Sequence, residues 1–252
     1  MNLTKIFDQS AEVLVAQVAE RTVSAILHAW NDNRDAHIVI TGGKLGIPVV
    51  KAIDFGLFRA TSQVREKKPS SSKRKDNFGK LHIWFGDERF VSWIDPDRND
   101  EDLIGGFKLV SQRAIFHRVL TPSDGPIADA ARQYSDQLSN ILGNEKFDVV
   151  ILSLGEDGHV ASCFPGDDKV LHSAERTVAV EDSPKPPSAR VTITVNQLTK
   201  CNQMYVLAIG ESKREALTQT LAQADWENPT LPVELMRRSA NNGALFVLTD
   251  LN

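Results

Sequence analysis

The stretch FDVVILSLGEDGHVASCFPG, residues 147–166, joins the clearest strand pattern of the chain to its clearest turn. Residues 147–152 form a short apolar run rich in β-branched side chains, which indicates a strand buried in a parallel sheet. Gly155 and Gly158 follow, and because glycine adopts positive φ easily, the chain can turn sharply as it leaves the sheet. Ligands of open α/β sheets bind at the carboxyl ends of the strands. We therefore expect His159 at a catalytic position; the alternative is a solvated histidine in a surface turn.

The rest of the chain alternates apolar strands with helical patterns. We predict strands at residues 37–41, 81–85, 177–180, 190–195, 203–209 and 244–248, and helices at 8–31, from 47, at 99–115, at 126–142 and after 210. Residues 116–120 fit either a strand or a loop. Repeated strand–helix units predict an α/β, Rossmann-like fold with a mostly parallel sheet and helices on both faces. No glycine-rich or proline-rich linker divides the chain, so we expect residues 1–252 to form a single domain.

Composition argues against several classes of partner. The 252 residues carry a net charge of −4 with a pI of about 5.9, which suits neither nucleic acid nor an anionic membrane. Cys163 and Cys201 are too few for a disulfide framework. The N-terminus lacks a signal-peptide pattern, and no apolar run approaches the roughly 20 residues of a membrane span. We expect a cytoplasmic protein, monomeric rather than oligomeric, that acts on a small molecule.

One segment, residues 59–80, is of low complexity. It carries eight lysines and arginines, with Pro69 and three consecutive serines. Such a composition is typical of an exposed, mobile loop between two strand–helix units. A basic patch for a polyanionic partner is the other interpretation.

A first candidate anion site follows the strand at residues 37–41. There the chain reads Gly42-Gly43-Lys44-Leu45-Gly46 before a helix begins. Backbone N–H groups at a helix start point outward, the helix dipole adds positive potential, and Lys44 adds a full charge. The alternative is a tight strand-to-helix turn that binds nothing, because a glycine pair alone is not a nucleotide-binding motif.

Arg89 stands just after the next predicted strand, in the run Asp87-Glu88-Arg89. A guanidinium matches two phosphate oxygens at once, so Arg89 is a candidate phosphate ligand. The alternative is a structural pairing with Asp87 or Glu88. Asn99, further on, is interpreted as the N-cap of the predicted helix at residues 99–115.

Three further cations lie beyond the central loop. Lys213 falls in the first turn of a predicted helix, where the dipole disfavours a cation unless both share an anion. The alternative is an ordinary surface lysine. Arg190 opens an alternating strand and is a further candidate to face the site. Lys185, in the stiff loop Ser183-Pro184-Lys185-Pro186-Pro187, is interpreted as solvated.

Four motifs resemble those of one known family. Residues 154–166 resemble the signature of the 6-phosphogluconolactonases, in the wider group that includes the glucosamine-6-phosphate deaminases. Residues 84–91, WFGDERFV, resemble a second signature, and the SPKPP loop leading into Arg190 resembles a third. Gly210 and Lys213 match the family's Gly-x-x-Lys, whose lysine is a substrate ligand. The third motif favours lactonases over deaminases, and the resemblance spans residues 36–250.

The resemblance implies hydrolysis of 6-phospho-D-glucono-1,5-lactone to 6-phospho-D-gluconate in the oxidative pentose phosphate pathway. It also implies a sugar-phosphate loop at Gly42 and Gly43. Lys44 departs from that pattern, because the family places a serine or threonine there. The alternatives are a glucosamine-6-phosphate deaminase or isomerase and a non-catalytic sugar-phosphate sensor.

The residues themselves fit lactone hydrolysis. The reaction needs a base to deprotonate water, and neutral imidazole titrates near working pH, so His159 is the candidate. Asp157 would orient the ring or a substrate hydroxyl. The groups expected to bind the substrate are Gly42, Gly43, Lys44, Arg89, Lys213 and Arg190. We expect no cofactor and no metal, because the six histidines and two cysteines show no ligand spacing.

Overall fold

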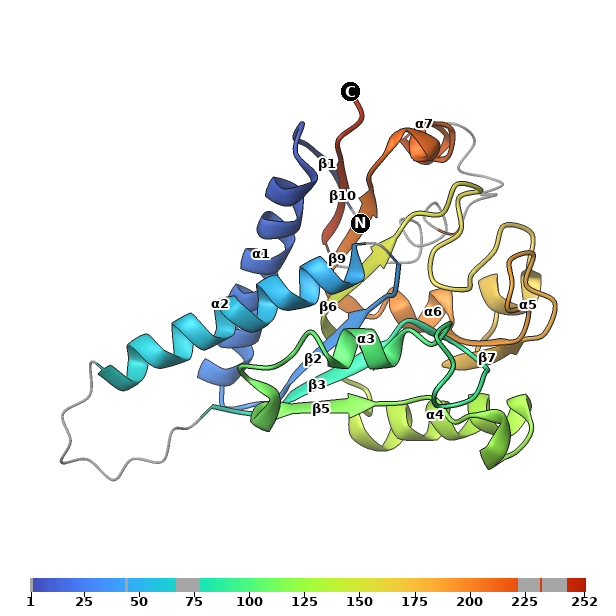
Figure 1. The fold of residues 1–252 in the computed structure, drawn as a ribbon, viewed down its shortest axis with the longest axis horizontal. Helices are drawn as coiled ribbons and strands as arrows, with labels where there is room; N and C mark the ends of the chain where they lie inside the picture. The colour runs from blue at the N-terminus through green and yellow to red at the C-terminus, as the bar shows by residue number, and fades with distance from the viewer. Residues whose placement is uncertain (1, 44, 67–77, 222–231, 233–243) are drawn as a thin grey trace.

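The computed structural model of the chain describes residues 2–43, 45–66, 78–221, 232 and 244–252. Among these residues, seven strands form a sheet in the order β1-β10-β9-β6-β2-β3-β5, and every neighbouring pair is parallel (Figure 1). The strands are β1 (Asn2–Phe7), β2 (Ala36–Ile40), β3 (Leu81–Phe85), β5 (Ala114–His117), β6 (Phe147–Ser153), β9 (Cys201–Ala208) and β10 (Ala244–Thr249). The predicted parallel α/β sheet is confirmed. Strand β1 was not predicted, because polar residues interrupt its apolar run.

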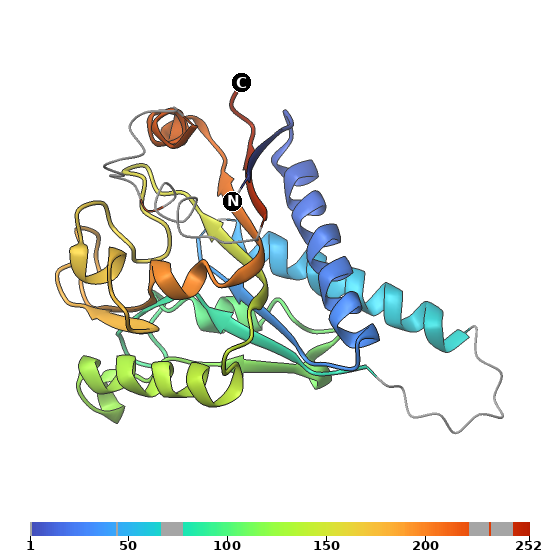
Figure 2. The same ribbon diagram turned by 180° about the vertical axis from the view of Figure 1, so that it is seen from behind.

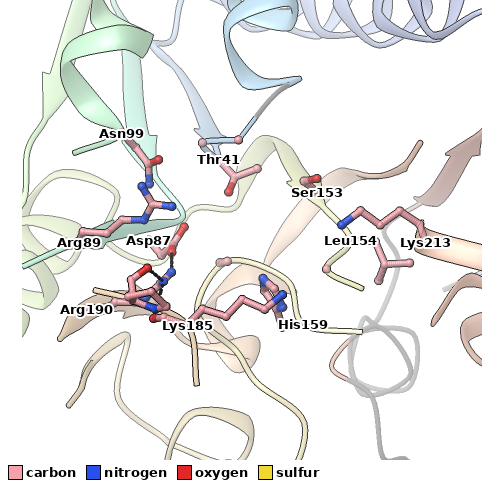
Figure 3. Close-up of a pocket in the computed structure, with 15 residues that line it drawn as sticks. Thr41, Asp87, Arg89, Asn99, Ser153, Leu154, His159, Lys185, Arg190 and Lys213 are labelled. Atoms are coloured by element: carbon pink, nitrogen blue, oxygen red, sulfur yellow. Dashed lines mark hydrogen bonds and ion pairs between the residues drawn. The ribbon is translucent and has the colours of Figure 1, made fainter. Parts of the chain in front are cut away.

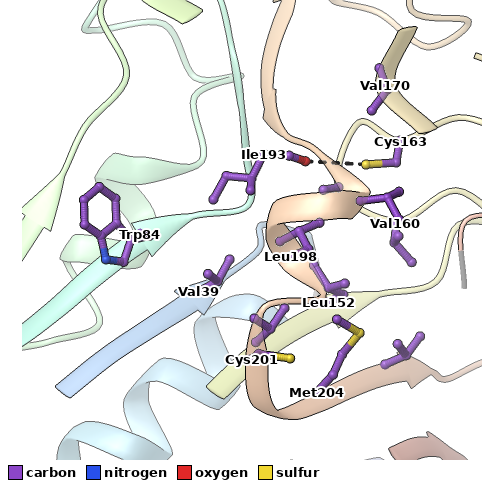
Figure 4. Close-up of a cluster of buried hydrophobic side chains, with 14 of the residues drawn as sticks. Val39, Trp84, Leu152, Val160, Cys163, Val170, Ile193, Leu198, Cys201 and Met204 are labelled. Atoms are coloured by element: carbon purple, nitrogen blue, oxygen red, sulfur yellow. Dashed lines mark hydrogen bonds between the residues drawn. The ribbon is translucent and has the colours of Figure 1, made fainter. Parts of the chain in front are cut away.

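Helices cover both faces of this sheet (Figures 1 and 2). On one face lie α1 (Ala11–Asn31), α2 (Gly46–Glu66) and α3 (Asp100–Ile104), and on the other lie α4 (Ile127–Ile141), α5 (Asp168–Leu171), α6 (Val195–Leu198) and α7 (Arg214–Leu221). Side chains alternate along a strand, so β2 sends Ile38 to the first core and Val39 to the second. Figure 4 shows the second core, where Val39 and Trp84 of neighbouring strands lie with Leu198 of α6. The double burial explains the continuous apolar runs in the sequence.

A second, smaller sheet stands at the carboxyl edge of the first. Its strands β4 (Asp87–Arg89), β8 (Arg190–Ile193) and β7 (Thr177–Val180) are antiparallel, in the order β4-β8-β7. Because β4 follows β3 directly, the small sheet carries Arg89 and its pairing partner Arg190 to the strand ends of the large one. The predicted strand at 190–195 ends at Ile193, because Thr194 Oγ1 accepts the N–H of Gln197 at 3.3 Å and begins α6.

The predicted helix at residues 99–115 is wrong beyond its first turns. Helix α3 ends at Ile104, before the pair Gly105-Gly106, and glycine is a poor helix former. The buried carboxylate of Asp54, on α2, then accepts N–H groups of residues 108–110 at 2.9–3.1 Å. These bonds hold the chain out of a helix, and after the short turn η1 (Ser111–Arg113) it enters β5. The ambiguous residues 116–120 thus begin as the end of a strand.

Helix α2 runs further than predicted. Residues 59–66, predicted as part of a basic loop, continue the helix, and Thr61 buries its side chain there. Arg59 lies over the ring of Phe55, 5.8 Å from its centroid. Residues 67–77 lie outside the described residues, so the mobile loop stays a prediction there. In the part of the chain that the structure describes, no helix combines the length and apolar character that crossing a bilayer requires.

Three histidines on adjacent strands stack on the face covered by α4. The rings of His37 and His82 lie 4.5 Å apart, and the rings of His117 and Trp84 lie 3.7 Å apart. Nδ1 of His82 and Nε2 of His117 are 2.9 Å apart and share a hydrogen bond. Trp84 Nε1 donates to His37 Nδ1 at 3.3 Å. Each of the three imidazoles thus has a hydrogen-bond partner in the protein, and all three belong to the core.

Candidate active site

A cavity of about 290 Å³ opens where the carboxyl ends of β2, β3, β6 and β9 meet the small sheet (Figure 3). Its position is the one that the parallel sheet predicts for a ligand site. The lining residues come from loops far apart in the sequence: Thr41, Gly42, Gly43, Asp87, Arg89, Asn99, Ser153, Leu154, Gly155, His159, Ala161, Lys185, Pro186, Arg190 and Lys213. The structure therefore brings the predicted His159, Gly42, Gly43, Arg89, Arg190 and Lys213 to one place.

His159 is held in a fixed orientation beside the cavity. Its ring lies over Gly155, where an added Cβ would stand 2.1 Å from Nδ1, so only glycine fits. Its other side packs on the ring of Phe164, with the centroids 4.8 Å apart. Nδ1 makes a short hydrogen bond with the carboxylate of Asp157. With Nδ1 as the donor, the Nε2 lone pair is available as a base.

Burial sets the charge state of His159. It lowers the pKa of the imidazole, and the bond to Asp157 opposes that effect without cancelling it. The ring is therefore neutral at pH 7, which is the form that can accept a proton. The structure brings Asp157 to the ring, the first of the two positions predicted for it.

The glycine pair after β2 lies against Asn99. A Cβ on Gly42 would stand 1.9 Å from Asn99 Oδ1, and Gly43 has a φ of 87°, so both positions require glycine. Asn99 holds the predicted N-cap position of α3, but its side chain makes no capping bond. The buried carboxylate of Glu88 instead accepts the N–H groups of Asn99 and Asp100, each at 2.8 Å. The prediction of a side-chain cap is wrong, and Asn99 lines the cavity instead.

Glu88 also fixes the backbone of Arg89. Burial raises the pKa of Glu88 to about 7, and its carboxylate accepts the N–H of Arg89 at 2.8 Å. The Arg89 guanidinium makes no ion pair with Asp87 or Glu88; Nη1 donates to the carbonyl oxygen of Asp97 at 2.5 Å. Its Nε is buried and has no hydrogen-bond partner among the described residues. A ligand with acceptor oxygens would satisfy it.

Lys213 enters from the opposite side of the cavity (Figure 3). It lies in the 3₁₀ turn η3 (Glu211–Lys213), which continues directly into α7 at Arg214, so the predicted first helical turn is present as a 3₁₀ turn. Its Nζ is 3.9 Å from Glu156 Oε1, which orients it towards the loop of His159. Lys44 lies outside the described residues, and its predicted role stays a prediction.

Arg190 is buried beneath the cavity and binds mostly protein. Its guanidinium donates to the carbonyl oxygens of Lys185, Pro186 and Pro187 at 3.0–3.2 Å, and its Nη1 is 3.7 Å from Asp87 Oδ2. Burial lowers the pKa of Arg190, and the carboxylate of Asp87 opposes that shift. Asp87 is fixed in turn by Ser162 Oγ, which donates to it at 2.7 Å.

The sequence missed Lys185. Predicted as solvated, it lines the cavity, and its Nζ is 3.6 Å from Asp157 Oδ1. The signal was present in the prolines on both sides, which restrict the loop that carries it. Asp87 and Ser153 also line the cavity and were not predicted as site residues.

The charges around the cavity select an anion. Arg89, Lys185, Arg190 and Lys213 face one carboxylate, that of Asp87, among the lining residues that the structure describes. In the described ranges, no three His, Cys, Asp or Glu side chains gather in a way that could hold a metal ion. The arrangement therefore offers a neutral base, a cluster of cations and peptide N–H groups to a small anionic ligand.

Comparison with known proteins gives a consistent set of relatives. The family model for glucosamine-6-phosphate isomerases/6-phosphogluconolactonase matches residues 9–246. The 6-phosphogluconolactonase of Mycobacterium tuberculosis is 31% identical over 238 residues, which cover 88% of this chain and 86% of that protein. The Bos taurus 6-phosphogluconolactonase is 36% identical over 173 residues, covering 66% of this chain and 64% of that one.

Solved structures share the fold. The 6-phosphogluconolactonase from Shewanella baltica superimposes with a TM-score of 0.75 at 21% identity, covering 98% of this chain and 96% of that one. The enzyme from Trypanosoma brucei gives a TM-score of 0.75 at 20% identity, with 98% and 96% covered. At 20–21% identity the solved structures establish only the shared fold, and family membership rests on the family model and the curated relatives.

Proposed function

This chain belongs to the family of glucosamine-6-phosphate isomerases and 6-phosphogluconolactonases, and from that premise we propose that it hydrolyses 6-phospho-D-glucono-1,5-lactone to 6-phospho-D-gluconate. Its place would be the oxidative pentose phosphate pathway. Relatives named 6-phosphogluconolactonase, matched over most of both chains, support the substrate. The observation that carries the proposal is a half-buried, neutral His159, bonded to Asp157, at a cavity lined by cations.

We assign the chemical step to His159. A water molecule attacks C1 of the lactone while Nε2 takes its proton, and the carbonyl oxygen becomes an oxyanion. The bond between C1 and the ring oxygen then breaks, and the ring oxygen receives the proton to become a hydroxyl. General-base catalysis of this kind contributes about 10²–10⁴-fold. Asp157 keeps the Nδ1–H donor in place and stabilises the imidazolium that forms.

We assign the phosphate to the groups around the glycine pair. Gly42, Gly43, Arg89 and Lys213 line that part of the cavity, with Lys44 predicted to join them. Binding energy at this remote group positions the carbonyl at His159. The main role that we assign to Arg190 is to fix the loop at Lys185 through its hydrogen bond to the carbonyl oxygen of that residue. Its predicted direct contact with the substrate would contribute less to binding.

The test is proton release from freshly prepared 6-phosphogluconolactone, followed with an indicator dye in weak buffer. Ammonia release from glucosamine 6-phosphate is measured beside it. We expect proton release well above the spontaneous rate and no ammonia. Ammonia release without lactone hydrolysis would identify a deaminase, and 6-phosphogluconate binding without turnover would identify a sensor.

The proposal also covers the localisation, oligomeric state and domain organisation of the protein. We propose a cytoplasmic, monomeric enzyme in which residues 1–252 form a single domain, with no cofactor. The two buried cysteines and the acidic net charge support this setting. Size-exclusion chromatography with light scattering tests the monomer.

A further inference from the structure

The main chain of Lys185 is fixed from beneath the cavity. Its N–H donates to Ser183 Oγ at 3.2 Å, and its carbonyl oxygen accepts from Ser183 Oγ and from Arg190 Nη2, both at 3.0 Å. Arg190 is buried and approaches Asp87, so the loop is tied to the strand ends of the sheet. These bonds leave the side chain of Lys185 to extend into the cavity towards His159 (Figure 3).

The ammonium of Lys185 and the ring of His159 share one anchor. Oδ1 of Asp157 bonds Nδ1 of His159 and lies 3.6 Å from Nζ of Lys185. One carboxylate oxygen therefore sets the position of the base and of the cation beside it. An ammonium has three donors, and a single contact at this distance leaves others for a ligand.

The ion pair between Lys185 and Asp157 does not by itself explain why the loop holds Lys185 at this position. Both side chains are about two-fifths exposed, at 41% and 39%, and exposed ion pairs contribute little to stability. The loop nevertheless uses a buried arginine to deliver Lys185 to this place. The bonds from Arg190 to the loop therefore serve to place Lys185 in the cavity rather than to stabilise the fold.

The other cavity cations already have proposed roles, Arg89 and Lys213 at the phosphate and Arg190 in holding the loop that carries Lys185. Arg190 is surrounded by the carbonyl oxygens of residues 185–187, Arg89 is tied to the carbonyl of Asp97, and Lys213 lies by Glu156. The base must act on water next to C1 of the lactone. The cation that shares a carboxylate with the base is therefore the one placed at the C1 carbonyl oxygen.

We propose that Lys185 is a catalytic residue, whose ammonium donates a hydrogen bond to the C1 carbonyl oxygen and stabilises the oxyanion formed when water attacks. The step rests on the proposed lactonase function. The water oxygen bonds to C1, the carbonyl π electrons move onto the oxygen, and His159 holds the proton from water. As the ring C–O bond breaks, the oxyanion returns its electrons to C1, and Lys185 stays charged throughout.

The kinetic test compares Lys185→Met, which keeps the stem, with Lys185→Arg, which keeps the charge. Removing one oxyanion donor typically costs about 10²–10³-fold in kcat, so we expect Lys185→Met to lose about 100-fold. The substrate carbonyl is neutral in the ground state, so KM should change by less than about threefold. Lys185→Arg should recover part of kcat, and circular dichroism of all three proteins checks folding.

The binding test uses two ligands that differ only at C1. 6-Phosphogluconate carries a carboxylate there, and glucitol 6-phosphate carries a hydroxymethyl group with the same phosphate. We expect Lys185→Met to weaken the first about tenfold or more, as for a lost charge-assisted contact, and to leave the second unchanged. The matched control Lys213→Met should weaken the binding of both ligands equally, because we assign Lys213 to the phosphate that they share.

The outcomes separate this inference from the proposed function. If the wild-type protein does not hydrolyse the lactone, the proposed function fails first. If it does, and Lys185→Met keeps kcat within about threefold of wild type, Lys185 is no oxyanion donor. Equal losses of affinity for both ligands would also overturn the proposal, because they would place Lys185 at the phosphate.

Discussion

We expect acid to destabilise this protein through His37 and His117, which lie in the core away from the cavity. Both are nearly inaccessible, at 4% and 5% exposed. Burial and then the positive charge that His82 would carry lower the pKa of each to about 4. Asp148 and Asp35 oppose the shift at His37, and a hydrogen bond with Gln137 opposes it at His117. The folded state therefore keeps both rings neutral where the unfolded chain protonates them.

The size of the effect follows from linkage. Unfolded histidine has a pKa of about 6.5, so between about pH 6.5 and pH 4 the unfolded chain binds up to two more protons. The free energy of unfolding then falls by about 1.4 kcal/mol per pH unit for each histidine, or about 3 kcal/mol each by pH 4. The stabilisation is complete above pH 6.5 and is lost on acidification. It is comparable with the roughly 5–15 kcal/mol of a typical domain.

The assay is urea unfolding followed by tryptophan fluorescence across this range of pH. His117→Gln loses the stack on Trp84 and the bond to His82, so it should be less stable than wild type at neutral pH. It also loses one shifted imidazole, so its stability should fall less steeply, by about 1.4 kcal/mol per pH unit. The two curves should converge as the pH falls. His28→Gln, at a side chain 77% exposed on α1, is the control for the substitution itself.

Parallel curves for wild type and His117→Gln would refute this reasoning, because the acid sensitivity would then come from other groups. The carboxylates of ion pairs, such as Asp148 with Arg34, are the competing source. They are protonated mainly below the histidine range. The comparison is therefore most informative between about pH 6.5 and pH 5.

Three further predictions concern catalysis and phosphate binding. His159→Ala should lower kcat by at least about 100-fold with little change in 6-phosphogluconate affinity, and near-wild-type kcat above the spontaneous background would remove His159 from the base role. In the wild type, burial lowers the pKa of His159, so the acid limb of kcat/KM should lie below pH 6.5. Arg89→Ala and Lys213→Ala should each weaken 6-phosphogluconate binding by about 1.5–3 kcal/mol in calorimetry, and unchanged affinity in both would move the phosphate elsewhere. Lys44→Ser should weaken that binding and make it less sensitive to salt; superimposable titrations at low and high salt would leave Lys44 a surface residue.

The sheet could be predicted because its signal is local. Strands covered on both faces must be apolar along their whole length, so residues 147–152 are recognisable without knowing their neighbours. The turn to His159 was also recognisable, since Gly155 and Gly158 directly follow that strand. Geometry adds the reason for Gly155, which is the room that the imidazole of His159 occupies.

Long-range contacts decide what the sequence could not predict. Residues 108–110 are kept out of a helix by Asp54, a carboxylate more than fifty positions earlier in the chain. Asn99 was predicted to cap α3, but Glu88 takes that role from the neighbouring strand β4. In both cases a buried carboxylate satisfies several backbone N–H groups at once, and that outcome depends on which segments fold side by side.

Arg190 and Lys185 both line the cavity, but at different depths. Arg190 was predicted as a further candidate to face the ligand and Lys185 as solvated; both line the cavity, but the side chain of Arg190 is 6% exposed and that of Lys185 is 41% exposed. The physical difference lies in the two cations. A planar guanidinium has five donors and weak hydration, so it can be buried against three carbonyl oxygens and a carboxylate. A compact ammonium is strongly hydrated and is better kept at an open cavity, where water or a ligand oxygen solvates it. An Arg190→Lys exchange would therefore leave carbonyl oxygens of the loop without donors, and the ammonium of Lys185 would lose its fixed position beside His159.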